Sequence, residues 1–174
     1  MSRGLRYALS EVRENYRSFN WWRNRVFVRY VLGTLSRLHP QYPGYDEAID
    51  VPAADWDNLI VLDGCRADAF ERVVDTDRFD DYRAVVSAGS HSSEWTARNF
   101  GGGSFGDIVY VSANPHTSKL AGDSFHEVVE MWNTEFDESA GTVLPDAMAD
   151  AARETAAAHP DKRLVGHFMQ PHGP

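Results

Sequence analysis

The sequence predicts an α/β fold, a doubly wound and mostly parallel sheet with flanking helices that follows an amphipathic helical arm. Short apolar runs without strict alternation indicate parallel strands covered by helices. They lie at residues 58–62, 107–112 and 163–169. Helical segments separate them, as such a sheet requires. With 174 residues and 43% hydrophobic content, the chain suits one domain with a sizeable core.

Residues 1–40 are expected to form a basic helical arm. Apolar residues recur at helical spacing from Leu5 to Leu35, and eight arginines and two glutamates give the arm a net charge of +6. Trp21 and Trp22 beside Arg23 suit a helix lying on an anionic membrane surface. A helix packed on its own domain or on a partner is the alternative, and both remain open.

After this arm, residues 41–54 predict an extended connector, and residues 55–174 predict the domain that carries the sheet. Strands are expected at 58–62, 82–87, 107–112 and 163–169, the first of them central and covered on both faces. Helices are expected at 66–74, 93–100 and 144–158, the last with Pro145 in its first turn.

Charge and composition exclude several classes of function. Residues 41–174 carry a net charge of −15 within a chain of −9, which argues against nucleic-acid binding. Only two of the 17 basic residues are lysines, a balance that resembles proteins of salt-loving archaea. Cys65 is the only cysteine, so no internal disulfide forms. Without an apolar membrane span or a secretory leader, we expect a cytoplasmic protein, or one held peripherally at a membrane by residues 1–40.

Asp63 stands where the first apolar strand ends, and ligands of open α/β sheets bind at that edge. A partly desolvated carboxylate there needs a cation, either a metal ion or Arg66, unless it caps the following helix. The run NLIVLDGCRADAF resembles the opening strand of the alkaline phosphatase superfamily, especially its sulfatase-like branch. The resemblance implies that Asp63 binds metal. Gly64 stands where sulfatases have a second acidic ligand, which disfavours a sulfatase-type calcium site.

The segment SAGSHSSEWTARN, residues 87–99, resembles the family's nucleophile region at a helix N-terminus. The resemblance implies a serine nucleophile at Ser92, with Ser90 as the nearest rival. The segment has no cysteine, no proline and no arginine in the position that matches the formylglycine sulfatases, which disfavours that class. Helix capping is the structural alternative for these serines. His91 is either a substrate contact or an exposed loop residue.

The segment HFMQPHGP, residues 167–174, resembles the sulfatase loop whose histidine contacts the sulfate or phosphate group. His172 matches that histidine, whereas His167 is expected in the core or behind the site. The family completes its metal site with a later Asp-His or Asp-Asn pair, so we expect the 174-residue chain to be a truncated member. A fragment and a split protein are the alternatives to truncation.

The sequence therefore predicts a metal-dependent hydrolase or transferase of small sulfate or phosphate esters. Its site residues are Ser92 as nucleophile, Asp63 as metal ligand, and Ser90, His91 and His172 at the substrate. The cofactor is a divalent ion, Zn, Mn, Mg or Ca, and a chain truncated before the later ligands would be metal-free and inactive. The alternative is a non-catalytic binding or membrane-associating protein with a degenerate sulfatase-like fold.

Overall fold

The structure is a computed structural model that describes residues 12–13, 16–23, 27 and 45–171. It divides into two compact units, Met1–Gly44 and Tyr45–Pro174. In the first unit, the helix α2 (Phe19–Trp21) begins after Ser18, whose hydroxyl accepts the Trp21 N–H at 3.3 Å. Most of the expected arm lies outside the described residues.

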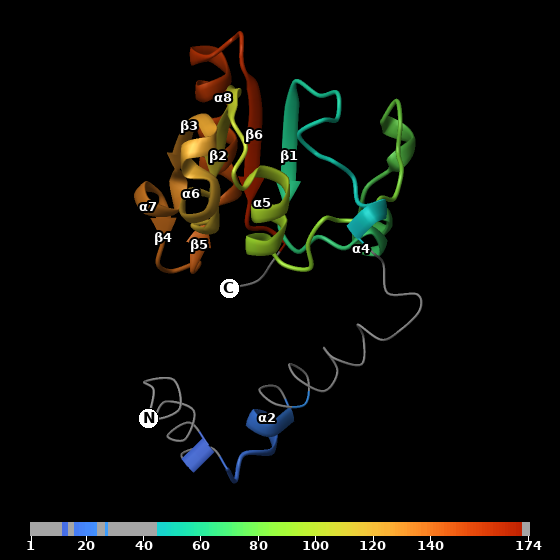
Figure 1. Ribbon diagram of the computed structural model, residues 1–174, viewed down its shortest axis with the longest axis vertical. Helices are drawn as coiled ribbons and strands as arrows, with labels where there is room; N and C mark the ends of the chain where they lie inside the picture. The colour runs from blue at the N-terminus through green and yellow to red at the C-terminus, as the bar shows by residue number, and fades with distance from the viewer. Residues whose placement is uncertain (1–11, 14–15, 24–26, 28–44, 172–174) are drawn as a thin grey trace. The chain divides into compact units, whose positions relative to one another are not determined.

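A four-stranded sheet forms the centre of the second unit (Figure 1). In spatial order its strands are β1 (Asn58–Leu62), β6 (Arg163–Phe168), β2 (Phe105–Ser112) and β3 (Phe125–Glu130). Every neighbouring pair is parallel. The residues that follow the four strands therefore meet at one edge of the sheet. A separate antiparallel hairpin joins β4 (Phe136–Asp137) to β5 (Thr142–Val143).

Helices lie on both faces of this sheet (Figure 1), so the α/β architecture is confirmed. The α-helices are α4 (Ala67–Val73), α5 (Ser92–Phe100), α6 (His116–Ala121), α7 (Met131–Thr134) and α8 (Pro145–Ala158). Three single 3₁₀ turns are η2 (Tyr45–Glu47), η3 (Thr76–Arg78) and η4 (Gly122–Ser124). One core cluster, around Phe100, Tyr110 and Val165, lies beneath α5 and α6. The other, around Val111, Met131 and Met148, lies beneath α7 and α8.

The first strand lies at an edge of the sheet rather than at its centre. β1 pairs with β6 on one side, and its exposure alternates along the strand. Leu59 and Val61 pack against the core, whereas Ile60 and Leu62 are 66% and 39% exposed. The prediction that both faces of β1 are covered was wrong. A short apolar run by itself does not distinguish a doubly covered strand from an edge strand.

Two further segments differ from the prediction. Residues 82–87 form no strand, because only Val86 makes a parallel bridge, to Ala48. The compact unit begins at Tyr45, so residues 45–54 of the expected connector belong to it. Trp56 holds that segment in place, since its indole N–H donates to the Val51 carbonyl at 2.8 Å and both residues join the core.

Within the described part of the chain, no helix is both long enough and apolar enough to cross a membrane.

Candidate functional site

Asp63 lies where β1 ends, as its place after an apolar run predicted. Its backbone N–H donates to the Phe168 carbonyl at 3.0 Å, which continues the parallel ladder by one residue. Gly64 then takes a positive φ of 68°, a conformation that glycine adopts without steric cost, and turns the chain away from the sheet. The Asp63 side chain, 13% exposed, is therefore held at the carboxyl edge of the sheet.

Three side chains from different elements converge on one carboxylate oxygen of Asp63. The Ser92 hydroxyl donates to Oδ2 at 2.7 Å, and the Asn114 amide donates to the same atom at 3.0 Å. The Nε2 atom of His167 lies 3.8 Å from Oδ2, the distance of a loose ion pair when the ring is protonated. The other oxygen, Oδ1, accepts no hydrogen bond from any residue that the structure describes.

These neighbours change the acidity of Asp63. Burial alone would raise the pKa of this carboxyl. The attraction of His167 and the hydrogen bonds from Ser92 and Asn114 outweigh burial and lower the pKa to about 2. Asp63 is therefore an anion at neutral pH, as a metal ligand must be.

A buried polar network lies behind Asp63. The Tyr110 hydroxyl is 2.9 Å from Nδ1 of His167, and the Thr117 and Ser112 hydroxyls are 2.9 Å apart. All four side chains are at most 1% exposed. Burial raises the pKa of Tyr110, so its phenol keeps its proton.

Ser90 and His91 cap the helix that Ser92 begins. His91 is the N-cap residue of α5, and its Nδ1 accepts the Glu94 N–H at 3.3 Å and lies 2.8 Å from the Ser93 hydroxyl. Glu94 in turn accepts the backbone N–H of Ser90 at 3.1 Å and its hydroxyl at 3.0 Å. This reciprocal arrangement is a variant of the capping box. Helix capping therefore accounts for Ser90, and also for His91, which was expected as a substrate contact or an exposed loop residue. The Ser92 hydroxyl instead points to Asp63.

A cleft of about 600 Å³ opens beside these groups. Its lining includes Asp63, Cys65, Ser90, His91, Ser92 and His167. Arg66 also lines the cleft but pairs with Asp68 at 2.8 Å, so it is not the cation that neutralises Asp63. The remaining predicted site residue, His172, lies outside the described residues.

The described residues supply only part of a metal site. Within 45–171 and the short described stretches of the arm, no three His, Cys, Asp or Glu side chains are grouped so as to hold a metal ion. Asp63 and Ser92 together carry three side-chain oxygens, while Ca²⁺ takes six to eight oxygen ligands and Mg²⁺ takes six. The side-chain oxygen Oδ1 of Asn114 already accepts the His116 N–H at 2.9 Å. Any further donors would be water, substrate oxygens or residues outside the described part.

Sequence reasoning missed the role of Asn114. Asn114 follows β2 by two residues, and β2 was among the expected strands, so the rule that placed Asp63 at a strand end applied here as well. The sheet order hid this role, because β2 is joined to β1 only through β6, the last strand in the sequence. His167 was expected in the core or behind the site, and it lies directly behind Asp63.

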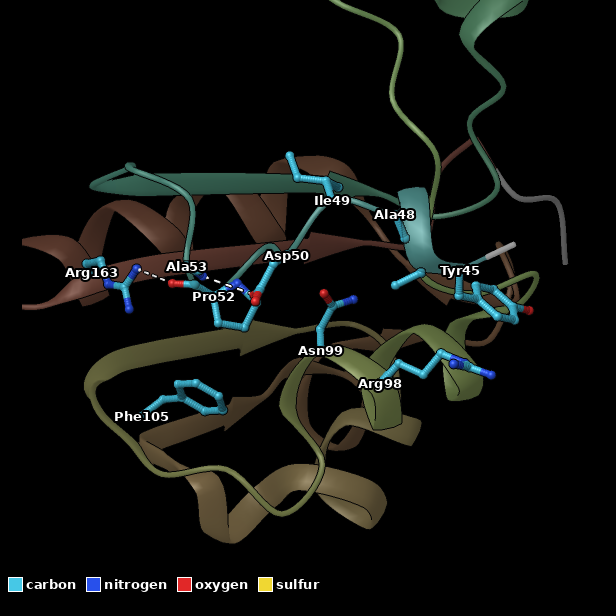
Figure 2. Close-up of a pocket in the computed structure, with 11 residues that line it drawn as sticks. Tyr45, Ala48, Ile49, Asp50, Pro52, Ala53, Arg98, Asn99, Phe105 and Arg163 are labelled. Carbon is cyan, nitrogen blue, oxygen red and sulfur yellow. Dashed lines mark hydrogen bonds between the residues drawn. The ribbon is translucent and has the colours of Figure 1, made fainter. Parts of the chain in front are cut away.

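A second cavity, of about 610 Å³, lies between residues 45–53, the last turn of α5 and the first residues of β2 and β6 (Figure 2). Arg163 and Arg98 lie toward its two ends, with Asp50 and Asn99 between them (Figure 2). Its arginines are already engaged. Arg163 donates to Asp107 at 2.8 Å and to the Pro52 carbonyl at 3.2 Å, and Arg98 donates to Glu94 at 3.3 Å while lying over the Tyr45 ring. These contacts fasten the segment before β1 onto the sheet.

Neither the family models, nor the curated proteins, nor the solved structures include a match to this chain.

Proposed function

We propose that this chain forms part of a sulfatase-like, alkaline-phosphatase-like domain. In this proposal it carries site residues of a metal-dependent hydrolase or transferase that acts on sulfate or phosphate esters. One observation carries the proposal, the 2.7 Å hydrogen bond between the Ser92 hydroxyl and Asp63. It joins the expected nucleophile to the expected metal ligand at the edge of the sheet where ligands bind. The cleft beside the two residues has room for a small ester.

The position of Ser92 supports its role as nucleophile. It is the first residue of α5, a helix of nine residues, so the free N–H groups and positive end of the helix face an anionic ester at this point. A divalent cation held by Asp63 would supply positive charge that eases ionisation of the Ser92 hydroxyl and neutralises the ester oxygens. Ser92 Oγ gives up its proton to solvent and bonds to phosphorus or sulfur, while the ester oxygen leaves with its electron pair and takes up a proton from solvent. Water or an alcohol acceptor afterwards releases the group from Ser92.

The direct test is turnover of p-nitrophenyl phosphate, bis(p-nitrophenyl) phosphate and p-nitrophenyl sulfate by the full chain, each with Mn²⁺, Zn²⁺, Mg²⁺ or Ca²⁺. We expect Ser92→Ala to abolish nitrophenol release and the covalent adduct seen by mass spectrometry, while Mn²⁺ binding is retained. Ser93→Ala is the matched control, because the Ser93 hydroxyl contacts His91 instead of Asp63. Undiminished turnover in Ser92→Ala would move the nucleophile elsewhere.

A non-catalytic binding protein is the second candidate. It is favoured by the small number of metal donors, since Asp63 is the only carboxylate that lines the cleft in the part of the chain described. In that case wild type and Ser92→Ala would bind inorganic phosphate or sulfate equally, and neither would form product or adduct.

The membrane-associating form of this second candidate predicts that deletion of residues 1–40 abolishes sedimentation with anionic vesicles. Equal pelleting of both proteins would exclude that form.

A further inference from the structure

Tyr110 and His167 form a buried pair that the proposed chemistry does not use. They lie on the neighbouring strands β2 and β6, and their side chains are 0% and 1% exposed. The Tyr110 hydroxyl and Nδ1 of His167 are 2.9 Å apart. Burying a phenol and an imidazole completely costs free energy of folding unless each of their polar atoms has a hydrogen-bond partner. Nδ1 has its partner in Tyr110, which leaves Nε2 directed at Asp63.

The packing around His167 fixes the plane of its ring. The Trp95 ring stands edge-on to the imidazole with centroids 5.9 Å apart, and the centroid of the tilted Tyr110 ring lies 6.0 Å from that of the imidazole. The backbone is fixed as well, because the His167 carbonyl accepts the Ala113 N–H at 3.0 Å. A ring flip would remove Nδ1 from Tyr110 and Nε2 from Asp63 together. The imidazole is therefore held in one orientation.

Two contacts of the ring together favour one position for its proton. The anionic carboxylate of Asp63 lies beside Nε2 and attracts an N–H there, and the Tyr110 hydroxyl beside Nδ1 can then donate to that nitrogen of the neutral ring. The hydrogen then lies on Nε2, the atom 3.8 Å from Oδ2 of Asp63. A protonated imidazole places a hydrogen on Nε2 too. In both states the ring presents N–H to the carboxylate.

We propose that Tyr110 and His167 are positioning residues that hold the Asp63 carboxylate in one rotamer, with Oδ2 turned to Ser92 and Oδ1 left for a ligand. Tyr110 does not line the cleft, and His167, which does, acts in this role through Asp63. The catalytic consequence rests on the proposed function, whereas the positioning itself is a property of the folded chain. Partners behind a metal ligand of this kind commonly govern its orientation and its affinity for the ion.

The first test observes the imidazole directly and needs no metal. Long-range ¹H–¹⁵N correlation spectra of the full chain report which nitrogen of His167 carries hydrogen, with His167→Gln used to assign its signals. We expect hydrogen on Nε2 in the wild type and a mixture with the Nδ1–H form in Tyr110→Phe, which keeps the ring but loses the hydroxyl. Tyr82→Phe is the matched control, because its hydroxyl contacts Glu71 at the surface. Hydrogen on Nδ1 in the wild type, or no change in Tyr110→Phe, would overturn the proposal.

The second test measures Mn²⁺ affinity by electron paramagnetic resonance. We expect His167→Leu to weaken Mn²⁺ binding about 10- to 100-fold and His167→Gln to recover most of the loss, since its carboxamide N–H can replace Nε2–H. Equal Mn²⁺ affinity of His167→Leu and wild type would contradict the positioning role and would leave the proposed function intact. If the wild type binds no Mn²⁺, the proposed metal role fails, and the spectra alone decide the positioning role.

Discussion

Ser92 Oγ donates a 2.7 Å hydrogen bond to Asp63 Oδ2 across 29 residues of sequence. β1 delivers the carboxylate to the carboxyl edge of the sheet, and α5 begins with the serine at that same edge. The intervening chain packs loosely, with Val73 and Val85 exposed at 83% and 53%. The contact is therefore set by two elements of the packed core rather than by the segment that links them.

Acid stability should depend on Asp63. Its pKa in the folded protein is about 2, below the unfolded value of 3.8, so its contribution to stability is present above pH 4 and is lost as pH falls toward 2. We expect Asp63→Asn to lower the free energy of unfolding by about 2 kcal/mol at pH 7, with the difference from wild type shrinking below pH 4. Urea unfolding at pH 7, 4 and 3 measures this.

A matched pair of serines controls that experiment. Ser92→Ala removes one hydrogen bond to Asp63 and should weaken the acid dependence in part, whereas Ser93→Ala should leave it unchanged. Some acid dependence will remain in every variant. The backbone N–H of Ser90, together with the Tyr45 and Ser90 hydroxyls and Arg98, lowers the pKa of Glu94 to about 2 as well. Parallel pH profiles for wild type and Asp63→Asn would contradict the low pKa of Asp63.

The two isoleucines at 60 and 108 test the edge position of β1. Ile108 on β2 is 0% exposed, while Ile60 on β1 is 66% exposed. We expect Ile108→Ala to lower the free energy of unfolding by about 2–5 kcal/mol, because it leaves a cavity in the core. Ile60→Ala, the same change on a solvent-facing side chain, should cost less than about 1 kcal/mol. Similar losses for the two variants would mean that the outer face of β1 is covered.

Gly89 should tolerate no side chain. A Cβ at this position would lie 2.4 Å from the backbone nitrogen of Trp95 and 2.7 Å from its Cα, so α5 would have to move. We expect Gly89→Ala to cost about 1–3 kcal/mol, measured by urea unfolding, and to weaken any ligand binding in the cleft. Gly106→Ala is the control, because a Cβ there meets no atom within 4 Å. Equal stability of the two variants would argue against the close approach of Gly89 to α5.

Cys65 offers a single-site probe of the cleft. It is the only cysteine of the chain, it is partly exposed, and it lines the cleft two residues after Asp63. We expect vanadate, an oxyanion of the shape of phosphate, to slow the reaction of Cys65 with Ellman's reagent several-fold, since it would occupy the space beside the thiol. The rate is followed by absorbance with and without vanadate. An unchanged rate at saturating vanadate would place oxyanion binding away from this cleft.

The sequence predicted those elements whose patterns are local. The helix of residues 144–158 has proline in its first turn and an alanine-rich body, and the structure has α8 at Pro145–Ala158. The apolar run that begins at Arg163 forms β6, and the segment that begins at Ser92 forms α5. β3 was missed, because its sequence FHEVVE mixes charged and apolar residues and is a strand only when paired beside β2.

By itself, the sequence determined that Asp63 ends a strand and that Ser92 lies near a helix start, because apolar runs, turn residues and capping patterns act over a few residues. Tertiary structure alone decided that β6 inserts between β1 and β2. That insertion brings His167 behind Asp63 and Asn114 beside it, and it leaves β1 at the edge. Strand order depends on contacts between residues about 50 to 100 positions apart, which no local pattern encodes.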